Sequence, residues 1–361
     1  MKKNILYISP NFNLACGVSK HVFTLLTSEE LKKEFNLYFI TNGGNALQRL
    51  DRAGISYSLM EFSTDKIFHF NLLKNLKFLK SYCREKEINI IHSHHRFPEF
   101  LSNTIKNALG IKTVVTAHNF VTGFKMISYK SDIIIAISNS VKNHLLNYFG
   151  INTKKIEVLY NCVGLEKSQY KNKEGIKYQY GIPQNHFVLL YAGRVAPEKG
   201  IETLLEAVKM LTNDSQKVFL MIVGNNKNLS ELVKNKDILN NFLYLPPKEN
   251  LSDLFSIADA LILPSLKEGL GYTMLEAGLH KIPFIGSRRG GIAEFIENGI
   301  NGYLFEPGDA TELSEKIAYV LIHPDESASA ADKLLKKVLR ECNCTDYFRK
   351  LTEIYQHLLN R

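Results

Sequence analysis

Short apolar runs rich in β-branched residues alternate with longer amphipathic segments along most of the chain. In the first half, the expected strands cover residues 4–9, 36–41, 57–62, 89–92, 112–117, 133–138 and 156–160. Apolar strands separated by helical segments are typical of a parallel sheet that is covered by helices on both faces. Such crossover connections are right-handed, so the pattern predicts a Rossmann-like layer.

The same alternation starts again after a polar interruption over residues 166–181. Here the expected strands cover residues 187–192, 218–223, 242–245, 260–263, 283–286 and 303–305. A length of 361 residues suits two domains. We therefore predict an α/β protein with two tandem Rossmann-like domains, residues 1–165 and 166–344, that face a central cleft. An amphipathic C-terminal helix over 345–361 is expected to cross back to the first domain.

The positive charge is concentrated in the first half of the chain. Residues 1–160 contain 21 Lys and Arg against 11 Asp and Glu, whereas residues 161–361 contain 24 against 25. This asymmetry favours an anionic partner such as a membrane surface or a lipid phosphate. The chain has no RNA-binding signature or zinc finger, so nucleic acid is not expected as a partner.

An expected helix over residues 70–86 has two interpretations. It places Leu73, Leu76, Leu79 and Tyr82 on one face, with Lys74, Lys77, Lys80 and Arg84 interleaved. One interpretation is a helix packed on the core with a solvated basic side. The other is a surface that binds anionic lipid headgroups.

Cysteine usage and hydropathy predict where the protein resides. Its five cysteines form no CxxC pair, which suits a reducing cytoplasm. No apolar run approaches the roughly 20 residues of a membrane-spanning helix, and no signal peptide is recognised. We expect a cytoplasmic protein that associates peripherally with the inner face of the membrane.

The segment from Gly193 to Gly200 has the chemistry of a diphosphate site. It follows a buried strand and precedes a helix, and its sequence is Gly-Arg-Val-Ala-Pro-Glu-Lys-Gly. The two glycines allow close approach of the backbone, while Arg194 and Lys199 lie near a positive helix end. The alternative is a basic surface loop without a ligand.

A second such segment runs from Pro264 to Ala277. Glu268 is followed by Gly269, Leu270, Gly271 and Tyr272 at the start of an expected helix that contains Glu276. Ionised carboxylates accept hydrogen bonds from the paired hydroxyls of a sugar or a ribose, and successive amides at a helix start form an anion cradle. The alternative is an acidic helix start that simply complements the helix dipole.

Taken together, these motifs resemble those of the family 4 retaining glycosyltransferases of the GT-B fold. The resemblance continues through Gly290-Gly291-Ile292-Ala293-Glu294 and through Asn298-Gly299-Ile300-Asn301-Gly302. In the first domain it includes the sequences around Gly17, His92 to His94 and His118, although Cys16 stands where a second glycine is more usual. It covers nearly the whole chain.

The resemblance implies a role for each matching residue. Arg194 and Lys199 would bind the donor diphosphate and stabilise the departing nucleotide, and Glu268 would contact the transferred sugar. The other implied donor contacts are Gly17, Gly193, Gly269, Leu270, Gly271, Tyr272 and Glu276. His118 would act beside the donor sugar. The anomeric configuration would be kept, either by front-face departure or through a covalent intermediate.

Histidines cluster after two of the expected first-domain strands. His94, His95 and Arg96 are expected on the acceptor side, and His118 alone is also compatible with a hydrogen-bonded rim residue. We predict no metal site among the clustered histidines, because adjacent strand residues point to opposite faces. No Asp-x-Asp pair is present, so catalysis is expected to need neither a metal nor another cofactor.

These observations predict a hexosyltransferase that uses a nucleoside-diphosphate sugar, with UDP-sugar first and GDP-mannose second. The acceptor would be a glycan or a lipid-linked molecule in cell-surface polysaccharide synthesis. The alternatives are a sugar-nucleotide epimerase of the same fold and a noncatalytic nucleotide-sugar-binding subunit. A dehydrogenase is disfavoured because no GxGxxG follows the first strand.

Overall fold

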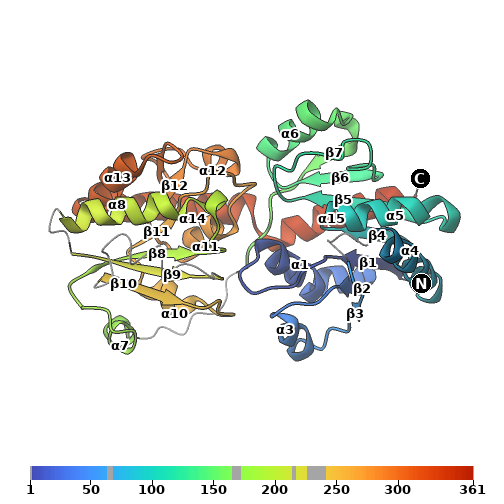
Figure 1. The fold of residues 1–361 in the computed structure, drawn as a ribbon, viewed down its shortest axis with the longest axis horizontal. Coiled ribbons are helices and arrows are strands. Elements are labelled where there is room, and N and C mark those ends of the chain that lie inside the picture. Colours follow the sequence, from blue (N-terminus) through green and yellow to red (C-terminus); the bar gives the residue numbers. More distant parts are fainter. Residues whose placement is uncertain (1, 63–67, 165–171, 214–216, 226–240, 361) are drawn as a thin grey trace. The chain divides into compact units, whose positions relative to one another are not determined.

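A computed structural model describes residues 2–62, 68–164, 172–213, 217–225 and 241–360. The chain divides into two compact units (Figure 1). Unit 1 contains Met1–Cys162 and Cys344–Arg361, and unit 2 contains Val163–Asn343. Each unit is a parallel sheet with helices, so the prediction of two Rossmann-like layers in an α/β protein is confirmed.

Unit 1 is built on a seven-stranded sheet in the order β3-β2-β1-β4-β5-β6-β7. Its strands are β1 (Lys3–Ile8), β2 (Phe35–Thr41), β3 (Ser58–Leu59), β4 (Ile90–Ser93), β5 (Lys112–Ala117), β6 (Ile133–Ala136) and β7 (Ile156–Val158). Its helices are α1 (Gly17–Thr27), α2 (Glu29–Glu34), α3 (Leu47–Arg52), α4 (Phe68–Glu85), α5 (Arg96–Leu109), α6 (Asn139–Phe149) and α15 (Cys344–Leu359).

Alternating side chains of β1 build separate cores on the two faces of this sheet. Ile5 and Tyr7 pack with residues of α1 and α15, whereas Leu6 and Ile8 pack with residues of α4 and α5. This is the period of two that a strand imposes on its side chains. The C-terminal helix α15, drawn in red in Figure 1, thus covers one face of a sheet whose strands begin at the other end of the chain.

Unit 2 is built on a six-stranded sheet in the order β10-β9-β8-β11-β12-β13. Its strands are β8 (Phe187–Ala192), β9 (Val218–Val223), β10 (Phe242–Leu245), β11 (Ala260–Leu263), β12 (Phe284–Ser287) and β13 (Tyr303–Phe305). Its helices are α7 (Lys173–Gln179), α8 (Ile201–Asn213), α10 (Ser252–Ile257), α11 (Tyr272–Leu279), α12 (Gly290–Phe295), α13 (Ala310–Ile322) and α14 (Pro324–Glu341). Helix α8 lies beside α13, and α11 lies beside α14.

Both strand orders contain a point where the direction of strand addition reverses. It lies between β1 and β4 in unit 1 and between β8 and β11 in unit 2. In parallel α/β sheets, ligands bind at the carboxyl ends of the strands that flank this point. The loops at these ends are those that carry Gly17 and His94 in unit 1, and the segments beginning at Gly193 and Pro264 in unit 2.

Helix α1 is followed directly by α2, which Ser28 begins by accepting a hydrogen bond from the Leu31 amide. Two other details differ from the sequence prediction. In α4, Leu73 is 72% exposed and does not join Leu79 in the core; the polar Asn75 is buried instead. Part of the polar interruption over residues 166–181 forms α7, while residues 165–171 lie outside the described part of the chain.

No helix in the described ranges is both long and apolar enough to cross a membrane.

Candidate active site

The loop between β8 and α8 is folded tightly against its neighbours in unit 2. The Tyr191 hydroxyl donates a hydrogen bond to the Arg194 carbonyl over 2.6 Å. Gly200 adopts φ +68°, and a Cβ at this position would lie 1.9 Å from the Pro264 carbonyl oxygen. A Cβ at Gly224 would lie 1.7 Å from the Gly193 carbonyl oxygen. Only glycine fits at these two contacts, so backbone packing fixes the position of the loop.

Lys199 and Glu268 come from the two predicted motifs and meet in the structure. Lys199 Nζ lies 2.6 Å from Glu268 Oε2, and their side chains are only 17% and 12% exposed. The buried Ser265 hydroxyl donates to the same carboxylate oxygen over 3.1 Å. The two loops are also joined through the backbone, since the Leu266 amide donates to the Glu198 carbonyl. The cation that was predicted to bind a phosphate and the carboxylate that was predicted to bind a sugar hydroxyl therefore lie in direct contact.

Arg194 lies at a more open position than Lys199. Its guanidinium is 2.8 Å from Glu198 Oε1, and the two side chains are 58% and 42% exposed. Exposed ion pairs of this kind contribute at most about 1 kcal/mol. The Arg194 guanidinium is therefore accessible and is held only weakly by Glu198.

The start of α11 presents backbone amides beside Glu268. Gly271 precedes the helix with φ +91°, and no side chain caps the helix start. The Thr273 hydroxyl donates to the Ala192 carbonyl and so holds the helix start against the end of β8. The backbone amides at a helix start favour an anionic ligand. Glu276 is half-buried within the same helix.

Gly290 and Gly291 begin α12, which packs against the backbone of this site. A Cβ at Gly291 would lie 2.2 Å from the Gly269 carbonyl oxygen, and the Gly291 amide donates to the Glu268 carbonyl. Gly291 thus lets α12 approach the backbone of the second motif. Sequence reasoning assigned no role to Ser265, Thr273 or Gly224, because the hydrogen-bond partner of a hydroxyl and the close contact of a glycine are not visible in the sequence.

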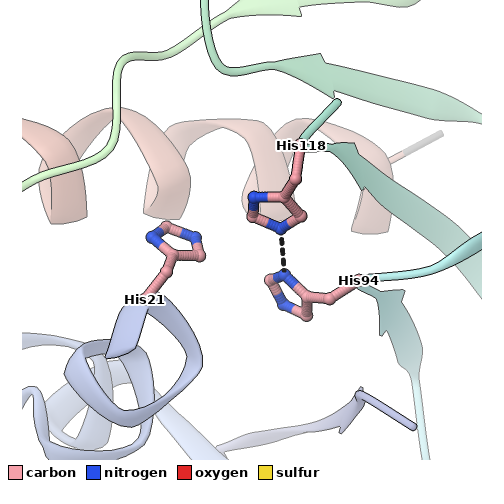
Figure 2. A group of neighbouring side chains, drawn as sticks. All are labelled: His21, His94 and His118. Atoms are coloured by element: carbon pink, nitrogen blue, oxygen red, sulfur yellow. Dashed lines mark hydrogen bonds between the residues drawn. The ribbon is translucent and has the colours of Figure 1, made fainter. Parts of the chain in front are cut away.

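In unit 1, four histidines form one buried group. Figure 2 shows His21 from α1 directed toward His94, which follows β4, and His118, which follows β5. His94 Nδ1 and His118 Nε2 are hydrogen-bonded at 3.0 Å. His92 stacks on His94 with ring centroids 4.5 Å apart. Adjacent strand residues point to opposite faces, and this separates His94 from His95. His92 and His94 are two residues apart and therefore lie on the same face.

Helix α15 completes this group with two tyrosines. The Tyr355 hydroxyl lies 2.6 Å from His92 Nδ1 and donates to the Tyr7 hydroxyl. The Tyr347 hydroxyl lies 3.3 Å from His21 Nε2. The rings of His92 and His21 are therefore hydrogen-bonded to the C-terminal helix, and the orientation of these histidines depends on how that helix packs.

Burial keeps these imidazoles neutral. It lowers the pKa of His21 to about 3 and lowers the pKa values of His92, His94 and His118 well below the usual range for histidine. A neutral imidazole donates one hydrogen bond and accepts one. His118 is therefore suited to accept or donate a hydrogen bond to a ligand, and not to supply a positive charge.

Among the described residues, three members of this group lie close enough together to hold a metal ion. One nitrogen from each of His21, His94 and His118 lies within 4.8 Å of the others. Histidine ligands ordinarily donate their second ring nitrogen to an acceptor, but His21 Nδ1 and His94 Nε2 have no partner among the described residues. The hydrogen bond between His94 Nδ1 and His118 Nε2 also occupies one ring nitrogen of each residue. We therefore retain the prediction of no metal here.

The remaining acceptor-side candidates lie apart from the buried histidines. His95 is exposed at the start of α5, where its ring accepts from the Phe97 amide. Arg96 donates to the carbonyl oxygens of Thr122 and Gly123 over 2.9 and 3.0 Å. His94 thus belongs to the buried histidine group, His95 caps α5, and Arg96 contacts the loop that contains Thr122 and Gly123.

Gly17 is the exposed first residue of α1, at the carboxyl edge of the unit 1 sheet. The preceding Cys16 has φ −127°, which any residue adopts, so cysteine in place of the more usual glycine causes no backbone strain. The Ser19 hydroxyl closes the loop before α1 by accepting from the Asn13 amide.

The sequences of known families match both units. Residues 16–167 match the model described as Glycosyltransferase Family 4, and residues 172–337 match the model described as Glycosyl transferases group 1. N-acetyl-alpha-D-glucosaminyl L-malate synthase of Bacillus anthracis is 26% identical over 295 residues, which are 77% of each chain. The capsular polysaccharide biosynthesis glycosyltransferase CapM of Staphylococcus aureus is 27% identical over about half of each chain.

Solved structures agree with these matches. A glycosyltransferase from Rickettsia africae has a TM-score of 0.82 at 25% identity, covering 99% of both chains. Anabaena HepE in complex with UDP and glucose has a TM-score of 0.83 at 16% identity, covering 98% of this chain and 99% of that one. The chain belongs to the family 4, or group 1, glycosyltransferases, and its fold is GT-B.

Proposed function

We propose that the protein is a retaining glycosyltransferase that moves a hexosyl unit from a nucleoside-diphosphate sugar to a glycan or lipid-linked acceptor. UDP-sugar is our first choice of donor and GDP-mannose the second. The reaction would serve cell-surface polysaccharide synthesis, on the cytoplasmic side of the membrane.

The meeting of Lys199 with Glu268 at the carboxyl edge of the unit 2 sheet is the observation that carries this proposal. A largely buried cation beside a helix start is suited to a diphosphate, and a carboxylate in the same site is suited to sugar hydroxyls. UDP in the HepE complex and the capsular polysaccharide named for CapM support the choice of donor and acceptor class.

In this proposal the protein stabilises the leaving nucleotide with fixed groups. Negative charge develops on the diphosphate as the glycosidic bond breaks. Lys199 and Arg194 would neutralise it, together with the amides that follow Glu268. Glu268 would then position the sugar, and Glu276 the ribose. His118 and Gly17 are assigned to the donor by the family resemblance, with His118 acting as a neutral hydrogen-bonding group.

We also propose that turnover needs no divalent metal. The chain has no Asp-x-Asp pair, and two side-chain cations are available for the charge that a metal would otherwise neutralise. Turnover that is unchanged by EDTA would support this proposal. Loss of turnover in EDTA with recovery in Mg²⁺ would overturn it.

A thermal-shift series with UDP, GDP and ADP tests the donor site, because a ligand that binds the native state raises its apparent stability. We expect the largest increase in melting temperature with UDP. Lys199→Ala should lose the increase, whereas Lys267→Ala, which removes an exposed lysine from the same loop as Glu268, should keep it. Absence of a shift with all three nucleotides would overturn the proposal.

Product analysis with the preferred nucleotide sugar then distinguishes the reactions. Transfer to an acceptor with the anomeric configuration kept supports a retaining glycosyltransferase. Conversion of one nucleotide sugar into another without acceptor would identify an epimerase. Binding without any turnover, across a panel of lipid-linked and glycan acceptors, would identify a noncatalytic subunit.

A further inference from the structure

Large apolar side chains are exposed together at one loop of unit 1. The segment Asn119–Ser131, here called the apolar loop, connects β5 to β6. Phe124, Met126 and Ile127 are 74%, 89% and 40% exposed. A turn at the tip brings them together, since the amides of Ile127 and Ser128 both donate to the Phe124 carbonyl. Exposed apolar groups gathered in this way indicate a contact surface.

One end of the apolar loop is held by a buried carboxylate. Glu99, which is fully buried in α5, accepts hydrogen bonds from the amides of Tyr129, Lys130 and Ser131 over 2.6 to 3.1 Å. The Ser131 hydroxyl donates to the same side chain. A buried carboxylate with this many donors fixes the backbone it binds.

The other end is held from two helices. Arg96 of α5 donates to the carbonyl oxygens of Thr122 and Gly123. The Gly123 amide donates to the Tyr148 hydroxyl of α6, and the ring of His144 bonds the Val121 carbonyl over 2.7 Å. Both ends are therefore fixed while the apolar tip faces solvent, so a partner would bind a surface that is already ordered.

The charges around the tip are positive. Lys125 and Lys130 lie in the apolar loop and are exposed, and the loop sequence contains no acidic residue. Lys125 Nζ is held 4.1 Å above the Tyr148 ring. Unit 1 as a whole has 24 Lys and Arg against 13 Asp and Glu. Apolar side chains flanked by lysines complement a bilayer interface, where acyl chains lie beneath anionic headgroups.

We propose that the apolar loop inserts Phe124, Met126 and Ile127 into the interface of an anionic bilayer, with Lys125 and Lys130 on the headgroups. This proposal rests on the proposed function, because it presents the carboxyl edge that carries His118 to an acceptor at the membrane. It assigns membrane binding to the loop and not to α4, where Leu73 is exposed but Phe78 stacks on Tyr82.

Vesicle sedimentation tests this assignment with the full chain. Vesicles contain either phosphatidylcholine alone or phosphatidylcholine with phosphatidylglycerol. We expect binding to the anionic vesicles, a partition coefficient at least about tenfold lower for Phe124→Ser/Met126→Ser, and loss of the anionic preference for Lys125→Gln/Lys130→Gln. The matched control Leu73→Ser/Phe78→Ser, on α4, should bind like the wild type.

Three results would overturn the proposal. They are no binding of the wild type to either vesicle, unchanged binding of the loop variant, and a loss confined to the α4 variant. Thermal shift with UDP on each variant shows that it is folded and reports donor binding separately. A protein that binds UDP and transfers sugar but does not bind vesicles would therefore refute membrane binding by the apolar loop without refuting the proposed function.

Fluorescence supplies a local reading of insertion because the chain has no tryptophan. Phe124→Trp and Leu73→Trp each introduce a single indole. Emission from Phe124→Trp should shift to shorter wavelength on anionic vesicles and be quenched by brominated acyl chains, whereas emission from Leu73→Trp should not. Quenching of the α4 reporter alone would assign membrane binding to α4.

Discussion

Lys199 Nζ and Glu268 Oε2 lie 2.6 Å apart, so the cation expected to bind the donor diphosphate is paired with the carboxylate expected to bind the donor sugar. Ser265 holds the carboxylate in place through its hydroxyl. A diphosphate that enters this site must share Lys199 with Glu268. The two side chains should therefore have opposite effects on nucleotide affinity.

Lys199→Ala should weaken UDP binding by about tenfold to a hundredfold, since a charge-assisted hydrogen bond contributes about 1.5–3 kcal/mol. Glu268→Gln should bind UDP at least as tightly as the wild type, because Lys199 no longer has an anionic partner, and yet lose sugar transfer. Calorimetric titration with UDP checks both, with Lys267→Ala as the control. Undiminished affinity in Lys199→Ala would contradict the assignment of the diphosphate site.

Gly200→Ala should destabilise unit 2 and abolish UDP binding. The added Cβ would meet the Pro264 carbonyl oxygen at 1.9 Å, and φ is +68°. Gly181→Ala is a matched control with φ +67° and no atom within 4 Å of the added carbon. We expect a loss of about 1 kcal/mol in the control and about 3 kcal/mol in Gly200→Ala. Urea unfolding followed by circular dichroism measures both, and equal losses would show that the contact with Pro264 is unimportant.

The buried histidines should make unit 1 sensitive to acid. Their pKa values are lowered in the folded state by burial, to about 3 for His21, against 6.5 for an ordinary histidine. The unfolded chain therefore binds more protons below pH 6.5, and stability falls as pH falls through this window. Each such proton contributes a slope of about 1.4 kcal/mol per pH unit.

Urea midpoints at pH 7.5 and pH 5 measure this effect. His21→Leu should reduce the difference between the two midpoints, because one titrating group is removed. His357→Gln, at an exposed position on α15, should leave the difference close to the wild-type value. A wild-type midpoint that does not fall between pH 7.5 and pH 5 would show that these histidines are not kept neutral by burial.

Tyr355→Phe should destabilise unit 1 by about 1–3 kcal/mol, because His92 Nδ1 and the Tyr7 hydroxyl both lose a buried partner. Tyr178→Phe, at a position that is 85% exposed in unit 2, should change stability by no more than about 0.5 kcal/mol. Urea unfolding compares the two variants. Similar small losses would mean that water replaces the lost hydroxyl of Tyr355.

Much of the fold could be predicted from hydrophobic periodicity. The expected bounds of β5, β8, β9, β10, β11 and β13 agree with the structure, because each of these runs is followed by a polar residue, a glycine or a proline. The predicted buried face of α4 was wrong at Leu73. Its spacing fits a helix face, but Asn75 takes the buried position and donates to the Glu61 carbonyl. Hydrophobic periodicity does not predict that a polar residue is buried when another part of the chain supplies its hydrogen-bond partner.

The site could be predicted in part. The two unit 2 motifs were recognised because glycines and charges stand between a strand and a helix, but the ion pair between Lys199 and Glu268 depends on strand order and not on either motif. In unit 1, His94 and His118 were expected. The structure adds their contact with His21 and the hydrogen bonds of the histidine group to Tyr347 and Tyr355. The two tyrosine contacts join residues 326 and 263 positions apart, which one sequence alone does not reveal.

The position of α15 has a consequence for how the chain acquires its structure during synthesis. Every strand of unit 1 leaves the ribosome before unit 2 does, yet the helix that covers one of its faces follows unit 2. The packing around Ile5, Tyr7 and the buried histidines therefore cannot be completed until the residues that follow unit 2 have been synthesised. Unit 2, which is continuous in the sequence, is able to finish folding first, and the nascent amino-terminal half must be kept from aggregating until translation ends.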